Sequence, residues 1–249
     1  ADLRIGSLAR RVQDRQAEEV IIALGSDVEG ESTAHYLADL LRPLVKEPGA
    51  SRQVRLVYAD TLNFLSHQRA DKEQAVADCE ESRAILIKMG ARDLTDLSAA
   101  SIYADTSDSQ ARHSAVLGQI DEAEALGREV FDIAEKVLVQ RPGDLRSMHN
   151  RALAPGFLSS IATRRHDYAG AVEYAIKSDQ ASESFVRFNP SNLTAWGMWV
   201  SSKNGLADAQ FDQGRIADAV TYFELALQRN PRFADAHLQL GICMVAEKK

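Results

Sequence analysis

Alanines recur at intervals of 48 residues along this 249-residue chain. Ala75, Ala123, Ala171 and Ala219 each lie near the start of a segment whose apolar residues are three or four positions apart, which is the spacing of an amphipathic helix. A fixed period of this kind is typical of stacked helical units, each of which buries its apolar face only against its neighbours. The register therefore predicts an array of helical hairpins.

Helical spacing extends over almost the whole chain, and strict alternation of apolar and polar residues is nearly absent. Short polar loops that contain Pro48, Pro142, Pro190 and Pro231 separate the amphipathic segments, because proline starts or stops helices. Connections this short join antiparallel helix pairs. The predicted helices are 3–24, 31–46, 52–67, 71–89, 94–115, 119–140, 144–164, 168–188, 192–212, 216–229 and 233–247.

The composition is that of a folded protein, with 45% hydrophobic and 26% charged residues. These proportions exclude a disordered, collagen-like or membrane chain. The formal net charge of −7 argues against nucleic acid as the main partner. The longest apolar run near the start, Val20 to Leu24, is far shorter than the ~20 residues that cross a bilayer, so we expect no membrane insertion. The first residues begin inside a helical pattern, which suggests a longer parent protein.

Sequence motifs for catalysis and cofactor binding are absent. The chain has no GxxxxGK[ST], GxGxxG, HExxH or GxSxG pattern, so nothing points to a phosphate-binding loop, a zinc hydrolase or a serine nucleophile. Cys79 and Cys243 lie on apolar helical faces, where small core residues are the better interpretation. We therefore expect no enzyme activity, no cofactor and no metal site.

The most specific pattern lies near the end of the chain. Gly214 is followed by Ala219, Phe223, Ala226 and Pro231, and then by Ala236, Leu240 and Gly241. This pattern resembles the tetratricopeptide repeat (TPR), in which small residues let two helices approach, an aromatic ring fills the space between them and proline ends the second helix. The resemblance covers roughly residues 50–249 and is specific over 215–241. The unit of 48 exceeds the ~34 residues of the common repeat, which predicts helices lengthened by about two turns each.

The resemblance implies an all-α fold, a right-handed superhelical solenoid of antiparallel helix hairpins. Residues 1–47 would form an N-terminal helical pair that caps the array, and 48–249 the array itself. The last helix, 233–247, would have no following partner. Its apolar residues, Leu238, Leu240, Ile242 and Val245, must then pack or remain exposed.

The resemblance also implies a concave groove lined by the first helix of each hairpin, which binds a peptide or protein segment. Arginine and asparagine there could hold a peptide carbonyl or carboxylate; the alternative for any one of them is a solvated surface side chain. The candidate peptide-binding residues carried over by position are Arg52, Arg55, Arg146, His149, Asn150, Thr194, Met198, Ser201, Lys203 and Asn204.

Two irregular stretches each have two interpretations. The polar stretch from Asp105 to Ser109 either faces the groove or is a frayed, wet part of its helix. Pro155 and Gly156 lie in the middle of the predicted helix 144–164 and predict a kink near Arg151. The kink either adjusts curvature or widens the groove for a ligand.

The leading hypothesis is a non-catalytic protein-interaction scaffold, similar to the C-terminal TPR regions of bacterial multidomain signalling proteins. One alternative is a regulatory domain that senses a peptide or small molecule near the kink, where Phe157 and Tyr168 could contribute aromatic contacts. Another is a self-association module that forms a homo-oligomer through the C-terminal helix.

Overall fold

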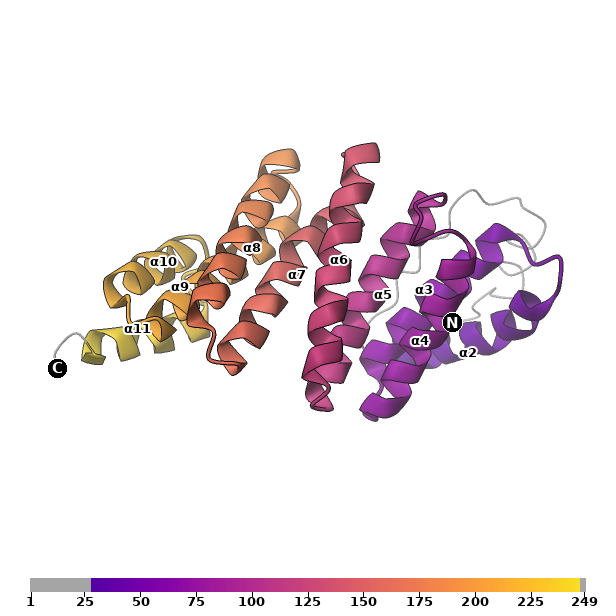
Figure 1. Cartoon of the computed structure of the whole chain (residues 1–249), viewed down its shortest axis with the longest axis horizontal. Coiled ribbons are helices and arrows are strands. Elements are labelled where there is room, and N and C mark those ends of the chain that lie inside the picture. Colours follow the sequence, from indigo (N-terminus) through magenta and orange to yellow (C-terminus); the bar gives the residue numbers. More distant parts are fainter. Residues whose placement is uncertain (1–27, 247–249) are drawn as a thin grey trace. The chain divides into compact units, whose positions relative to one another are not determined.

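The computed structural model describes residues 28–246, and every regular element in this range is an α-helix (Figure 1). Each predicted helix from 31–46 onward has a counterpart whose ends agree within three residues; the predicted helix 3–24 lies outside the described residues. The all-α prediction is confirmed. The helices are α2 Val28–Lys46, α3 Arg52–Gln68, α4 Lys72–Lys88, α5 Leu97–Val116, α6 Ile120–Gln140, α7 Leu145–Arg164, α8 Tyr168–Phe188, α9 Leu193–Asp212, α10 Ile216–Arg229 and α11 Ala234–Ala246.

The predicted register fixes where the second helix of each hairpin begins. Helices α4, α6, α8 and α10 start at Lys72, Ile120, Tyr168 and Ile216, at intervals of 48 residues. The four alanines of the register lie three residues inside these helices, and all four are 0% exposed. A methyl group at each position lets the paired helices approach closely. The register deduced from the sequence is thus confirmed by burial.

The second helices α6 and α8 agree with the prediction of helices lengthened by about two turns, whereas α4, with 17 residues, and α10 are shorter. Helices α6 and α8 contain 21 residues each, whereas α10 contains 14. The seven additional residues correspond to about two helical turns.

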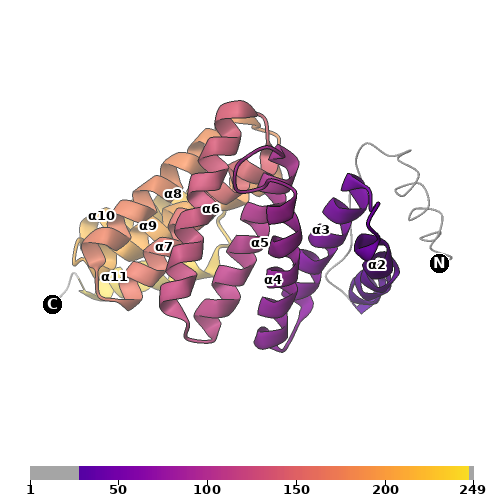
Figure 2. The same ribbon diagram turned by 45° about the vertical axis from the view of Figure 1, so that its right-hand side comes forward.

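The chain divides into two compact units, Ala1–Glu129 and Val130–Lys249, and the division falls inside α6. In the first unit, α3 packs against both α4 and α5, and α4 packs against α5 (Figure 2). Leu37 and Leu41 of α2 join Tyr58, Leu62 and Leu65 of α3 in one buried apolar cluster.

The polar stretch from Asp105 to Ser109 lies in the middle of α5, and its last four residues are at most 5% exposed. The interpretation as a frayed, wet stretch is therefore wrong. Hydrogen bonds with the neighbouring helix α3 replace water: Asn63 Nδ2 donates to Asp105 Oδ2 at 3.0 Å, and Ser109 Oγ lies 2.9 Å from His67 Nε2. These partners inside the unit make Asp105 and Ser109 tolerable in a buried helix, whereas the buried Oγ of Ser107 has no hydrogen-bond partner.

In the second unit, consecutive helices α7 to α11 pack in chain order. The first helices also pack on one another, α7 on α9 and α9 on α11, whereas in the described part of this unit no contact joins α8 to α10. Helix α7 continues through buried Pro155. Phe223 is 0% exposed in a cluster with Ala219 and Ala236, as the repeat pattern predicts. Within the described range no helix has the length and apolar character needed to span a bilayer.

The turn between the two helices of a hairpin also follows the register. Gly118, His166 and Gly214 occupy equivalent positions and have φ angles of 81°, 60° and 80°. This left-handed conformation is accessible to glycine without strain but disfavoured for residues with a side chain. Gly214, which opens the repeat pattern in the sequence, is therefore required by the backbone of the turn.

Replacing Gly214 with alanine is expected to lower the free energy of unfolding by about 1 kcal/mol, because a side chain strains the left-handed backbone. No atom lies within 4 Å of the added Cβ, so the backbone alone causes the effect. Gly205 is the matched control, since it lies inside α9 and its added Cβ also meets nothing. Gly205→Ala should raise the free energy of unfolding by up to about 1 kcal/mol. Urea denaturation measures both, and effects of the same sign would contradict the assignment of the turn.

Candidate functional site

One side of α9 forms a continuous accessible strip along a first helix of the second unit. Its residues are spaced three or four apart and therefore lie on one face of the helix, and each is exposed or half-buried. A second strip with the same spacing runs along α11. We name the two strips together the first-helix face. It comprises Thr194, Gly197, Met198, Ser201, Asn204, Gly205, Asp208 and Asp212 on α9, and Asp235, Leu238, Ile242 and Val245 on α11.

The middle of the α9 strip is lined by small residues. Gly197, Ser201 and Gly205 follow one another at intervals of four. A Cβ added to Gly197 or to Gly205 would meet no atom within 4 Å. The backbone of a bound chain could therefore approach this part of α9 more closely than a helix with large side chains would allow.

The C-terminal end of the α9 strip is acidic. Burial, together with the charges of Asp212 and Asp235, raises the pKa of Asp208 to about 6. Asn204 Nδ2 donates to Asp208 Oδ2 at 3.0 Å, while the buried Oδ1 of Asn204 has no hydrogen-bond partner. Among the described residues none of the three aspartates forms an ion pair. Helices α9 and α11 are in contact, and the charge of Asp235 contributes to the raised pKa of Asp208, so the two strips lie near each other at this end.

Four of the ten sequence-predicted residues lie on the first-helix face: Thr194, Met198, Ser201 and Asn204. Lys203 lies on the opposite side of α9, where it is only 9% exposed. Its Nζ forms a 2.8 Å ion pair with Asp179 Oδ2 of α8 and lies 5.2 Å from the centre of the Trp199 ring. Lys203 therefore links two helices and is unavailable as a surface peptide clamp.

Three predicted residues lie on α7. Asn150 is 0% exposed, which contradicts its assignment as a peptide-contacting residue. Arg146 and His149 are half-buried. Asn150 occupies the buried side of the helix because a shift of one position rotates a side chain by about 100°.

The two predicted arginines of α3 belong to the first unit. Arg52 Nη2 donates to Asp96 Oδ1 at 2.7 Å, and this bond raises the pKa of Arg52. Burial opposes ionisation of Asp96, but its bonds from Arg52 and from the amides of Ala99 and Ser98 lower its pKa overall. Arg52 thus holds the carboxylate that caps α5. Arg55 is half-buried on the same helix.

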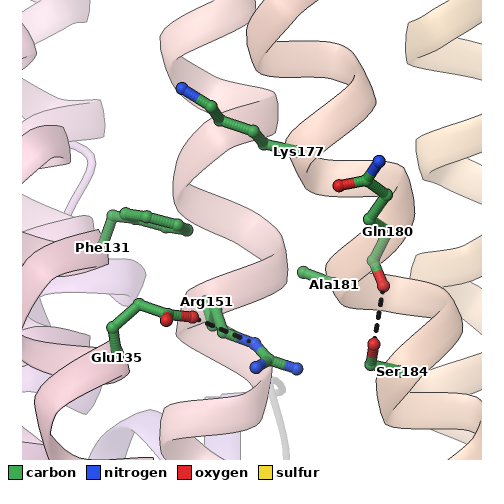
Figure 3. Close-up of a pocket in the computed structure, with 7 residues that line it drawn as sticks. All are labelled: Phe131, Glu135, Arg151, Lys177, Gln180, Ala181 and Ser184. Atoms are coloured by element: carbon green, nitrogen blue, oxygen red, sulfur yellow. Dashed lines mark hydrogen bonds and ion pairs between the residues drawn. The ribbon is translucent and has the colours of Figure 1, made fainter.

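A separate cavity of about 190 Å³ opens between helices α6, α7 and α8 of the second unit (Figure 3). Arg151 of α7 lies between side chains from α6 and α8, with its Nε 3.5 Å from Glu135 Oε1. The pocket was not predicted from the sequence, because its residues come from three helices. They are Phe131, Glu135, Arg151, Lys177, Gln180, Ala181 and Ser184.

Comparison with protein families identifies a match only at the start of the chain. A model of the Toprim domain matches residues 3–51. The recombination protein RecR of Cereibacter sphaeroides (strain ATCC 17025) is 55% identical over 42 residues, which are 17% of this chain and 21% of that protein. RecR of Bifidobacterium longum subsp. infantis is 52% identical over 44 residues, 18% and 22% of the two chains. The chain thus spans about a fifth of the length of the curated relatives it matches.

Comparison with solved structures covers most of the chain. BtubC (BKLC) from P. vanneervenii is 16% identical, with a TM-score of 0.63 over 88% of this chain and 83% of that one. A single-substitution variant of a putative kinesin light chain from Podosopora anserina, with nearly identical TPR-like repeats, is 19% identical, with a TM-score of 0.50 over 91% and 92%. These likenesses define the fold class: the chain is a TPR-like helical repeat protein.

Replacing Asp208 with asparagine is expected to raise the free energy of unfolding at pH 7 by about 1–2 kcal/mol. The folded-state pKa of about 6 exceeds the usual unfolded value of ~3.9, so ionisation is harder in the folded protein. The native chain therefore loses stability as the pH rises from about 4 to about 6, and the advantage of the variant should vanish below about pH 4. Glu224→Gln, on exposed α10 surface, is the control. A constant difference across this pH range in thermal or urea denaturation would contradict the assignment.

Proposed function

We propose that this chain is a non-catalytic protein-interaction scaffold, and that a segment of a partner protein binds along the first-helix face of its second unit. The TPR-like fold supports the scaffold function. The observation that supports the place of binding is the accessible strip of α9, with open space above Gly197 and Gly205 and unpaired carboxylates at one end.

The bound segment is a short extended or helical stretch. The strip from Thr194 to Asp212 is about 27 Å long at 1.5 Å per residue, which matches about eight residues of extended chain at ~3.3 Å each. Ser201 and Thr194 offer hydroxyl groups for its backbone, and the thioether of Met198 adapts to different side chains. Leu238 and Ile242 on α11 provide apolar contacts.

The preferred segment is basic. The clamp expected from the sequence included arginines and a lysine, but Lys203 and Arg52 form ion pairs within the protein. The charges on the first-helix face are those of Asp208, Asp212 and Asp235, and the whole chain carries −7. Electrostatic complementarity therefore favours lysine and arginine in the partner.

Selection from a displayed library of random eight-residue peptides, matched to the length above, tests this proposal. Selected peptides should carry net positive charge, and an Asp208→Asn/Asp212→Asn variant should bind them about five- to twentyfold more weakly. Affinity should increase as the pH rises through about 6, because Asp208 then becomes charged. The matched control is Glu224→Gln on α10, which should bind like the native chain. Selected peptides that are acidic, or that bind the double variant equally well, would contradict the proposal.

A second candidate function is self-association through α11. Leu238, Ile242 and Val245 are 66%, 42% and 60% exposed, as the prediction of an unpartnered last helix requires. Apolar residues gathered in this way commonly mark an interaction surface. The observation favours a homo-oligomer formed through this helix.

Analytical ultracentrifugation over a wide concentration range measures self-association. The native chain should show a mass that increases with concentration, and Leu238→Glu/Val245→Glu should remain monomeric, because two buried charges would disfavour the contact. Val139→Glu is the control, since Val139 is 82% exposed on α6. A native chain that is monomeric at every concentration would exclude this function.

The wider setting is also a proposal. We propose that the scaffold belongs to a larger bacterial signalling or regulatory protein and that residues 1–47 are the N-terminal cap of the array. The curated relatives that match part of the chain, including RecR of Cereibacter sphaeroides, support a bacterial source.

A further inference from the structure

The register of 48 residues brings equivalent positions together wherever one hairpin packs on the next. At each such joint the register aligns a residue from a second helix with one from the following first helix and one from the following second helix. The first joint contains Arg83, Tyr103 and Glu129, the second contains Phe131, Arg151 and Lys177, and the third contains Asp179, Trp199 and Leu225.

At the first joint, the carboxylate of Glu129 bonds to the other two residues. Tyr103 Oη donates to Glu129 Oε1 at 3.1 Å, and Arg83 Nη2 donates to Tyr103 Oη at 2.8 Å and to Glu129 Oε2 at 3.2 Å. The side chains of Arg83 and Glu129 are only 15% and 21% exposed. Arg92 pairs with the same carboxylate, so Glu129 is an internal anion shared by two arginines at this joint.

The third joint also contains a carboxylate that is bonded within the chain. The indole of Trp199 occupies the position that corresponds to Tyr103. Asp179, at the position of Arg83, accepts from Lys203 Nζ at 2.8 Å and from Ser202 Oγ at 3.2 Å. Here one carboxylate and one ammonium group neutralise each other inside the joint.

The second joint has a cation at the position that Glu129 occupies in the first, and its two cations pair with carboxylates at other positions. Arg151 replaces the aromatic ring, and Lys177 replaces Glu129, so both polar positions carry positive charge. The Nε of Arg151 is buried and makes no hydrogen bond. It forms a 3.5 Å ion pair with Oε1 of Glu135, whose side chain is 47% exposed. The ammonium group of Lys177 pairs with Glu173 at 2.7 Å on the same helix.

The cavity between α6, α7 and α8 lies at this joint. Figure 3 shows the guanidinium of Arg151 in the space between Glu135 and Ser184, with Phe131 on the side of α6 and Gln180 on the side of α8. A volume of about 190 Å³ exceeds the ~30 Å³ share of one water molecule several times. It therefore accommodates a carboxylate or phosphate group with a short aliphatic stem against Phe131.

We infer that this pocket binds an oxyanion, a carboxylate or a phosphate, which takes the place that Glu129 occupies at the first joint. Arg151 supplies a planar fork of donors suited to both groups. Lys177 adds charge at the rim, and the amide of Gln180 offers a further donor. The site is independent of the first-helix face, because its residues come from α6, α7 and α8.

Nuclear magnetic resonance of the arginine Nε–Hε groups tests this inference directly. Sodium phosphate and sodium acetate are titrated separately into the whole chain, with sodium chloride at equal ionic strength as the reference. The Arg151 signal should shift saturably, with half-saturation at roughly 1–10 mM. The signal of Arg187, an arginine 70% exposed on α8, should follow ionic strength only.

Two substitutions make the test specific. Lys177→Glu places a carboxylate at the position of Glu129 and should weaken anion binding tenfold or more, whereas Lys177→Gln should weaken it only a few-fold. Circular dichroism verifies that both variants remain folded. A response to phosphate alone, to acetate alone or to both supports the pocket and identifies a phosphorylated group, a carboxylate or either as its ligand. No response beyond that to chloride, or native affinity in Lys177→Glu, would overturn the inference.

Discussion

Close packing of helix pairs at four buried alanines is the constraint on which the rest of the structure depends. Each alanine is completely buried, and a larger side chain there would separate the two helices of its hairpin. Because the crossing points are equivalent, the starts of α4, α6, α8 and α10 repeat at the same interval. The left-handed turn residues and the residues at the joints then follow the same register. One small side chain in each 48-residue repeat thus determines the positions of many other residues.

Chemical differences between the 48-residue repeats arise where equivalent positions carry different side chains. Glu129, Lys177 and Leu225 occupy equivalent positions in the register, yet one is a carboxylate shared by two arginines, one is an ammonium group at the rim of a pocket, and one is apolar. The α9 strip differs from its neighbours in the same way, since glycines and a serine replace larger residues. The repeated backbone sets the positions of the side chains, and the differences between those side chains give each repeat its own chemistry.

The sequence predicted the helices well but the candidate site only in part. Helix ranges and buried alanines follow from local periodicity, which needs no knowledge of neighbouring helices. Whether Lys203 or Ser201 is exposed depends on which side of α9 faces the neighbouring helices. The two residues are two positions apart and therefore lie on nearly opposite sides of the helix. The cavity at Arg151 requires three helices to be placed together. The match of a Toprim domain model to residues 3–51 was not predicted from the sequence.

The central claim is that a partner segment binds the first helices of the second unit. Hydrogen–deuterium exchange of the chain, measured with and without a library-selected peptide, tests it without any substitution. The account predicts slower amide exchange in α9 and α11 on binding, with α8 and α10 unchanged. Protection confined to α8 and α10, with none in α9 or α11, would contradict it.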